Sequence, residues 1–301
     1  MRHDVTMPEL PEVEALAVFL TGQTAGRTVA GVEVGALNAL RTVVPAPADL
    51  VGLVVRGVAR HGKWLDLAAG TDDAGLHLVW HLAKAGWLRW SDSLSTTPVR
   101  PGRSPIALRV RLDDGSGFDL TEAGTRKRLA VHVVTDLDQV GPVATLGVEP
   151  LSPGFTRERF GALLASRNQQ VKGLLRDQSQ IAGIGNAYSD EILLVARTSP
   201  FALTATMDAD QADRVYDAVV QVLTEAVTTS SGRPAADLKD AKRRGMRVHG
   251  RTGEPCPGWD GTACGDTVRE VSFADSSLQY CPTCQTGGKP LADRRMSRLL
   301  R

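Results

Sequence analysis

Short apolar runs, several of them alternating with polar positions, fill the first half of the chain and predict a β-rich domain. They lie at about 53–67, 76–82, 107–112 and 117–121, and Gly, Pro or Ser separates most of them. The sequence Asp113-Asp114-Gly115 between two of these runs is a hairpin signal. We therefore expect antiparallel strands from about residue 28 to residue 134.

A helix is predicted before these strands. Pro11 suits the first helical position, and Glu12 complements the positive end of the helix dipole. Apolar residues from Val13 to Leu20 fall on one helical face, and Gly22 ends the pattern. The β-rich domain should thus begin with one long helix.

The second half of the chain has helical periodicity. A Pro- and Gly-rich stretch from Pro142 to Phe155 separates it from the strands and is typical of a linker. The predicted helices are Arg157 to Ser166, Lys172 to Gln178, Asn186 to Ala196 and Ala209 to Thr228. We expect an α+β protein with a β-sandwich-like domain at 7–135, a linker at 136–156, a helical domain at 157–250 and a cysteine module at 251–301.

Composition adds little about function. A chain of 301 residues can form two domains, and it has no apolar run near the ~18 residues of a membrane span and no secretory signal. We therefore expect a cytoplasmic protein. The net charge of +1 does not indicate nucleic acid, but residues 233–301 hold 13 Lys or Arg against 8 Asp or Glu. That basic region suits phosphate contacts or is an ordinary solvated surface.

All four cysteines lie in the last 46 residues, which favours a metal site over disulfides. Seven residues separate Cys256 from Cys264, sixteen separate Cys264 from Cys281, and Cys281 and Cys284 form a Cys-x2-Cys pair. Four thiolates can hold one tetrahedral Zn²⁺ with no open position, so the ion should be structural. The segments 267–273 and 278–280 can pair as a hairpin between the ligands. Four unrelated buried thiols, or a zinc ribbon of another kind, remain as alternatives.

Four ordered motifs resemble the formamidopyrimidine-DNA glycosylase and endonuclease VIII family, whose members combine helix–two-turn–helix and zinc-finger elements. They are Met7-Pro8-Glu9-Leu10-Pro11-Glu12-Val13-Glu14, Arg60-His61-Gly62-Lys63-Trp64-Leu65, the segment from Asp177 to Glu191 with Gly183-Ile184-Gly185-Asn186, and the segment from Val248 to Cys256. Together they span nearly the whole chain. The probability that all four match in order by chance is therefore under about one in a hundred.

The resemblance implies a base-excision-repair DNA glycosylase that is also an AP lyase. Pro8, exposed as the N-terminus when Met7 is removed, would attack the sugar carbon that bears a damaged base, and Glu9 would move protons. Lys63 would hold DNA phosphates and belong to the catalytic group. Asn186 would donate to a phosphate at a helix N-terminus. Lys84, Arg128 and Arg251 complete the expected DNA-binding set.

Three of the motifs also have a structural explanation. Pro8 and Glu9 could belong to an ordinary capped helix, Lys63 could be an exposed strand-end lysine, and Asn186 could be an N-cap.

We expect the partner to be damaged double-stranded DNA lying in a cleft between the domains of a monomer.

The sequence departs from the family at several positions. Lys84 stands where the family commonly has Met. Lys127-Arg128-Leu129 weakly resembles the family's Arg-Arg-Phe wedge, with Leu129 in place of the aromatic residue. Ser276 stands where the zinc-finger hairpin usually has Arg. The segment from Leu238 to Val248 is shorter than the loop that, in the formamidopyrimidine branch, covers the flipped purine. It therefore favours an endonuclease VIII-like or divergent member that acts on oxidised pyrimidines or on bulky lesions.

Six residues precede Met7. If they stay attached, Pro8 is an amide and cannot form a Schiff base. A start at Met7 therefore fits the enzyme hypothesis. Two rival hypotheses are a protein with a retained extension that binds damaged DNA without cutting it, and a zinc-ribbon adaptor with no DNA role.

Overall fold

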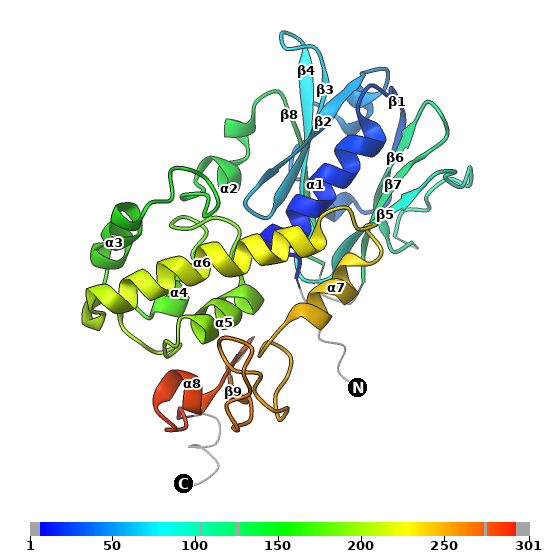
Figure 1. Cartoon of the computed structure of the whole chain (residues 1–301). Helices are drawn as coiled ribbons and strands as arrows, with labels where there is room; N and C mark the ends of the chain where they lie inside the picture. Colours follow the sequence, from blue (N-terminus) through cyan, green and yellow to red (C-terminus); the bar gives the residue numbers. More distant parts are fainter. Residues whose placement is uncertain (1–6, 103, 124–126, 274–275, 293–301) are drawn as a thin grey trace. The chain divides into compact units, whose positions relative to one another are not determined.

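The computed structural model describes residues 7–102, 104–123, 127–273 and 276–292 (Figure 1). The chain forms two compact units. Residues up to Leu146 pack with Ser230–Asp240, and Gly147–Thr229 pack with the residues from Ala241 onward. The six residues before Met7 lie outside the described part. No helix in the described ranges is long and apolar enough to cross a membrane.

The first unit contains two four-stranded antiparallel sheets, ordered β1-β6-β7-β5 and β2-β3-β4-β8. Trp80 on β4 and Phe118 on β7 belong to different sheets, and their stacked rings have centroids 5.7 Å apart in a shared apolar core. The expected β-sandwich-like domain and the α+β fold are confirmed. The strands are β1 (Val29–Val34), β2 (Val55–His61), β3 (Trp64–Gly70), β4 (Gly75–His81), β5 (Gly86–Ser91), β6 (Ile106–Leu112), β7 (Gly117–Glu122) and β8 (Ala130–Val134).

Helix α1 (Leu10–Thr24) packs on β2 and sends Leu16 and Leu20 into this core. The Thr21 hydroxyl donates to the Val58 carbonyl and accepts from the Val58 N–H, both at 2.9 Å. The helix continues past Gly22, where the sequence predicted its end. The Thr24 hydroxyl donates to the Leu20 carbonyl in the final turn.

The second unit is mainly helical and carries a two-stranded hairpin. The four predicted helices are present, as α3 (Arg157–Ser166), α4 (Val171–Arg176), α5 (Asn186–Val195) and α6 (Ala209–Ser230). The predicted hairpin pairs β9 (Arg269–Ser272) with β10 (Ser277–Tyr280). The sequence did not predict the short helices α2 (Gly141–Ala144), which lies inside the expected linker, α7 (Leu238–Gly245) and α8 (Pro282–Thr286).

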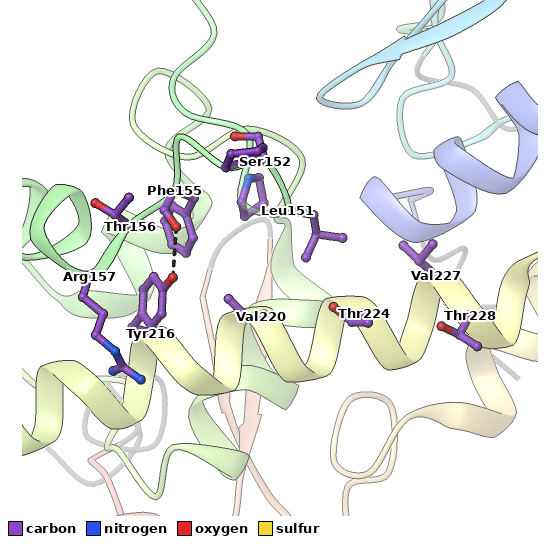
Figure 2. Close-up of a pocket in the computed structure, with 12 residues that line it drawn as sticks. Leu151, Ser152, Phe155, Thr156, Arg157, Tyr216, Val220, Thr224, Val227 and Thr228 are labelled. Atoms are coloured by element: carbon purple, nitrogen blue, oxygen red, sulfur yellow. Dashed lines mark hydrogen bonds between the residues drawn. The ribbon is translucent and has the colours of Figure 1, made fainter.

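The end of the expected linker is a packed loop on α6. Figure 2 shows Tyr216 of α6 beside Phe155, with the Tyr216 hydroxyl donating to the Phe155 carbonyl at 3.0 Å and the two rings stacked. The Arg157 guanidinium lies 4.7 Å from the Tyr216 ring centre and pairs with Asp213 and Asp217. Apolar side chains of α6 and the loop line a cavity of about 450 Å³ here.

One boundary differs from the prediction. Residues 230–240 were expected in the helical domain at 157–250, but they pack with the first unit. Ala235 and Leu238 are buried in its core, and the Trp87 indole N–H donates to the Ala235 carbonyl at 3.2 Å. Three apolar residues in a polar stretch give no periodic signal, so the sequence pattern could not place this segment.

Candidate functional site

Pro8 and Glu9 lie directly before α1, and both are buried. The Glu12 carboxylate accepts the Glu9 backbone N–H at 2.9 Å, and Pro11 occupies the first turn. Pro11 and Glu12 thus satisfy the helix N-terminus in the way the sequence predicted.

Lys63 occupies the two-residue turn between β2 and β3. His61 pairs with Trp64 across the turn, and Gly62 has φ +57°, a conformation that favours glycine. The Arg60 guanidinium donates to the Gly62 carbonyl at 3.1 Å and to the Glu14 carboxylate at 2.6 Å. This ion pair fastens the Lys63 turn to α1, the helix that Pro8 and Glu9 precede.

Lys63 is 8% exposed, so it is not the exposed strand-end lysine of the structural alternative. Burial, together with the positive charge of Lys63, lowers the pKa of His81 to about 4. The His81 Nδ1 accepts the Ala83 N–H at 3.1 Å, as a neutral imidazole can. A cationic lysine beside a neutral histidine suits a phosphate or another anion.

Lys84 is exposed in the turn that joins β4 to β5. Ala83 has φ +53°, and a Cβ on Gly86 would lie 2.1 Å from the Leu82 carbonyl oxygen. Close backbone packing thus fixes the turn that presents the Lys84 side chain.

Arg128 is exposed, and its backbone N–H and that of Leu129 donate to the Glu122 carboxylate at the end of β7. Leu129 is 1% exposed and belongs to the core. It therefore cannot replace a stacking aromatic without leaving the core. Residues 124–126 beside it lie outside the described part.

In the second unit, Asn186 begins α5 as expected. Its side-chain amide donates to the Ser277 carbonyl of β10 at 2.7 Å, and its buried Oδ1 has no hydrogen-bond partner among the described residues. Asn186 thus joins the helix N-terminus to the hairpin, next to Ser276. The amide that was predicted to reach a phosphate is engaged in this contact.

A buried charged network, which the sequence did not predict, supports this corner. Lys172 Nζ on α4 donates to the Asp190 carboxylate at 2.5 Å and to the Ser189 hydroxyl at 2.7 Å. Asp190 also accepts from His249 Nδ1 at 2.8 Å. The charges are paired and hydrogen-bonded, as buried charges must be.

Glu191 and Arg251 hold the segment that leads to the cysteines. The Glu191 carboxylate accepts the backbone N–H groups of Arg247, Val248 and His249 at 2.7–2.9 Å, and burial raises its pKa. The Arg251 guanidinium donates to the Met246 and Arg244 carbonyls and pairs with Glu254. In the structure, therefore, the Arg251 side chain organises this segment.

The ligand atoms of Cys256, Cys264, Cys281 and Cys284 lie within 4.8 Å of one another. A tetrahedral zinc with Zn–S bonds of ~2.3 Å needs sulfur atoms about 3.8 Å apart, so the cluster fits that ion. The Gly258 N–H donates to the Cys256 sulfur at 3.3 Å. Burial raises the pKa of Cys256 to about 12, so an ion bound here would displace thiol protons.

The structure brings the predicted residues together in two sets. Pro8, Glu9 and Lys63 share the first unit, whereas Asn186, Arg251 and the four cysteines share the second. Sequence reasoning missed Arg60, Lys172, Asp190 and Glu191 as the residues that fix these sets. The sequence did contain one signal of such a residue, which is a charged residue at an apolar position of a helix, as at Lys172.

Comparison with known proteins identifies the family. The model of the formamidopyrimidine-DNA glycosylase N-terminal domain matches residues 7–131, and that of the formamidopyrimidine-DNA glycosylase H2TH domain matches residues 146–235. An uncharacterized formamidopyrimidine-DNA glycosylase-like protein of Mycobacterium tuberculosis (strain H37Rv) is 60% identical over 142 residues, which cover 47% of this chain and 87% of that protein.

Relatives that align over most of the chain point to the same family. The formamidopyrimidine-DNA glycosylase of Parafrankia sp. (strain EAN1pec) is 36% identical over 93% of this chain and 98% of its own length. The crystal structure of the MutM (Fpg) protein from Thermus thermophilus aligns with a TM-score of 0.75 and 30% identity over 94% of this chain and all of that one. These matches, together with the motifs and the cysteine cluster, show that the chain belongs to the formamidopyrimidine-DNA glycosylase family.

Proposed function

We propose that this protein is a base-excision-repair DNA glycosylase with AP lyase activity, in which Pro8 is the nucleophile after removal of Met7 and everything before it. The observation that carries the proposal is the position of Pro8 and Glu9. They directly precede α1, and the Arg60–Glu14 ion pair ties that helix to the turn of the buried Lys63.

The chemistry follows from the residue types. As a terminal residue, Pro8 is a secondary amine, and α-amino groups titrate near ~8 against ~10.4 for lysine, so more of it is unprotonated at neutral pH. Its nitrogen bonds to the sugar carbon, and the damaged base leaves with the electrons of the glycosidic bond. Opening of the sugar ring gives a Schiff base, and β- and δ-elimination then break the strand. Glu9 carries protons during these steps, and Lys63 holds a phosphate.

The remaining predicted residues have binding roles in this proposal, except Arg251, whose side chain organises the segment before the cysteines. Lys84 and Arg128 are exposed cations of the first unit that contact damaged double-stranded DNA. The N-terminus of α5, which begins at Asn186, binds a phosphate through its backbone N–H groups. Cys256, Cys264, Cys281 and Cys284 hold one Zn²⁺, which stabilises the β9–β10 hairpin and takes no part in the chemistry.

The lesion preference is part of the same proposal. The segment between Leu238 and Val248 is short and contains α7. A short segment leaves less chain to cover a flipped purine, which favours oxidised pyrimidines or bulky lesions. A lesion panel with 8-oxoguanine opposite cytosine as the best substrate would contradict this preference and leave the glycosylase assignment standing.

Borohydride trapping on an abasic-site duplex tests the mechanism. Two proteins are compared, one that begins at Pro8 and one that keeps residues 1–6, with each N-terminus established by intact mass. Only the first should form a covalent link, because Pro8 in the second is an amide.

Binding to a duplex with a tetrahydrofuran abasic analogue serves as the control, since both proteins should bind it. Failure of the protein with terminal Pro8 to trap would refute the lyase mechanism and favour a protein that binds damage without cutting.

A further inference from the structure

A cavity of about 620 Å³ lies within the first unit, away from Pro8. Its walls come from α1, from β5 and its following turn, and from the segment 234–239, which packs with this unit. Phe19, on the wall from α1, is nine residues beyond the first helical residue, or about 13 Å along the axis. The cavity is therefore distinct from the candidate catalytic site.

Three aromatic side chains, Phe19, Trp87 and Trp90, form rigid walls. The rings of Phe19 and Trp90 meet edge to face with centroids 6.0 Å apart. The Trp87 indole N–H donates to the Ala235 carbonyl at 3.2 Å, and the Trp90 indole N–H donates to the Asp92 carboxylate at 2.8 Å. Both indole donors are thus engaged, and the rings offer a ligand only apolar surface.

The polar lining has two cations, one anion and one neutral amide. Arg89 is exposed and Gln23 is half-buried, and within the described ranges their side chains have no hydrogen bond or ion pair. The Lys239 ammonium lies 4.4 Å from the Trp87 ring centre. Asp92 supplies one negative charge and is held by Trp90. The lining therefore favours an anion next to an aromatic group.

We propose that this cavity binds a nucleotide, with the base on the aromatic walls and the phosphate on Arg89. A guanidinium matches phosphate oxygens with paired N–H donors, and aromatic side chains stack on any nucleobase. The volume lies within the range of about 300–1,000 Å³ typical of small-molecule sites. The nucleotide is either free or the 5′-phosphorylated end of a DNA strand, because both carry the same chemistry. The proposal does not depend on the Schiff-base mechanism.

Calorimetric titration of the full chain tests the proposal. The probes are adenosine 5′-monophosphate, adenosine, and trithymidylate with and without a 5′-phosphate. Arg89→Gln should weaken binding of the phosphorylated probes about tenfold and leave adenosine unchanged. Arg100→Gln removes an exposed arginine of the same unit that does not line the cavity, so it should match the wild type.

Trp90 provides a second measurement. Trp90→Leu should weaken every probe that carries a base, whereas Trp90→Phe should retain most of the affinity because it keeps an aromatic face. Binding of only the phosphorylated trinucleotide would assign the site to DNA ends, and binding of the mononucleotide would assign it to free nucleotides. The proposal would be overturned if neither the phosphorylated trinucleotide nor the mononucleotide bound. It would also be overturned if the wild type and Arg89→Gln bound these probes equally.

Discussion

Two glutamates three residues apart, Glu9 and Glu12, form a capping box at the start of α1. The Glu12 carboxylate caps the Glu9 N–H. The proposed proton transfers belong to Glu9. Because the proposed role of Glu9 is chemical whereas that of Glu12 is structural, substitutions should separate them.

We expect Glu9→Gln to reduce borohydride trapping and strand cleavage by at least about a hundredfold, since a general acid–base group contributes about 10²–10⁴-fold. Glu12→Ala should instead lower the free energy of unfolding by about 1 kcal/mol, the usual effect of losing a helix cap. Single-turnover nicking and urea denaturation measure the two effects. Normal nicking by Glu9→Gln would contradict the assignment of Glu9.

At this scale the motifs supplied the candidate residues for the chemistry but not the residues that position them. Arg60 lies inside a quoted motif, yet its partner Glu14 is 46 positions away in the sequence. A pattern of residue types does not specify which side chains meet across such a distance. The buried state of Lys63 and the low pKa of His81 likewise depend on packing that only the structure contains.

Among the elements, the four main helices and strands β2, β3, β4, β6 and β7 followed from the sequence pattern, whereas β1, β5, β8 and α7 were not identified individually. Helix α7 has few apolar residues, and its basic last turn of Lys242, Arg243 and Arg244 complements the helix dipole. The hairpin β9–β10 was predictable because the cysteines bracket it. Its attachment to α5 through Asn186 and Asp190 was not, since those contacts join distant segments.

The hairpin gives a prediction about metal. Native mass spectrometry should find one zinc per chain, and chelation should reduce hydrogen-exchange protection of β9 and β10 by about tenfold or more, because the ion joins both ends of the module. Strands β2 to β4 serve as the internal control, since the first 255 residues contain no cysteine. A zinc-free protein with the same protection in β9 and β10 would refute a structural ion.

For the whole molecule, charge balance gives no net attraction to DNA. The chain has 35 Lys or Arg against 34 Asp or Glu. Binding must therefore depend on local groups of cations, and the last turn of α7 is one such short run. Arg243 and Arg244 are both exposed there. A role in complementing the helix dipole would affect stability alone, whereas phosphate contacts would appear in the salt dependence of binding.

We predict that the double substitution Arg243→Gln and Arg244→Gln reduces the slope of log K against log salt by about 1.8, because each lost phosphate contact removes roughly 0.9. Fluorescence anisotropy with an undamaged duplex at several salt concentrations measures this slope. The matched control is Arg159→Gln with Arg167→Gln, which removes the same charge from exposed positions on or beside α3. An equal reduction in both double variants would mean that binding responds to total charge, and the α7 assignment would fail.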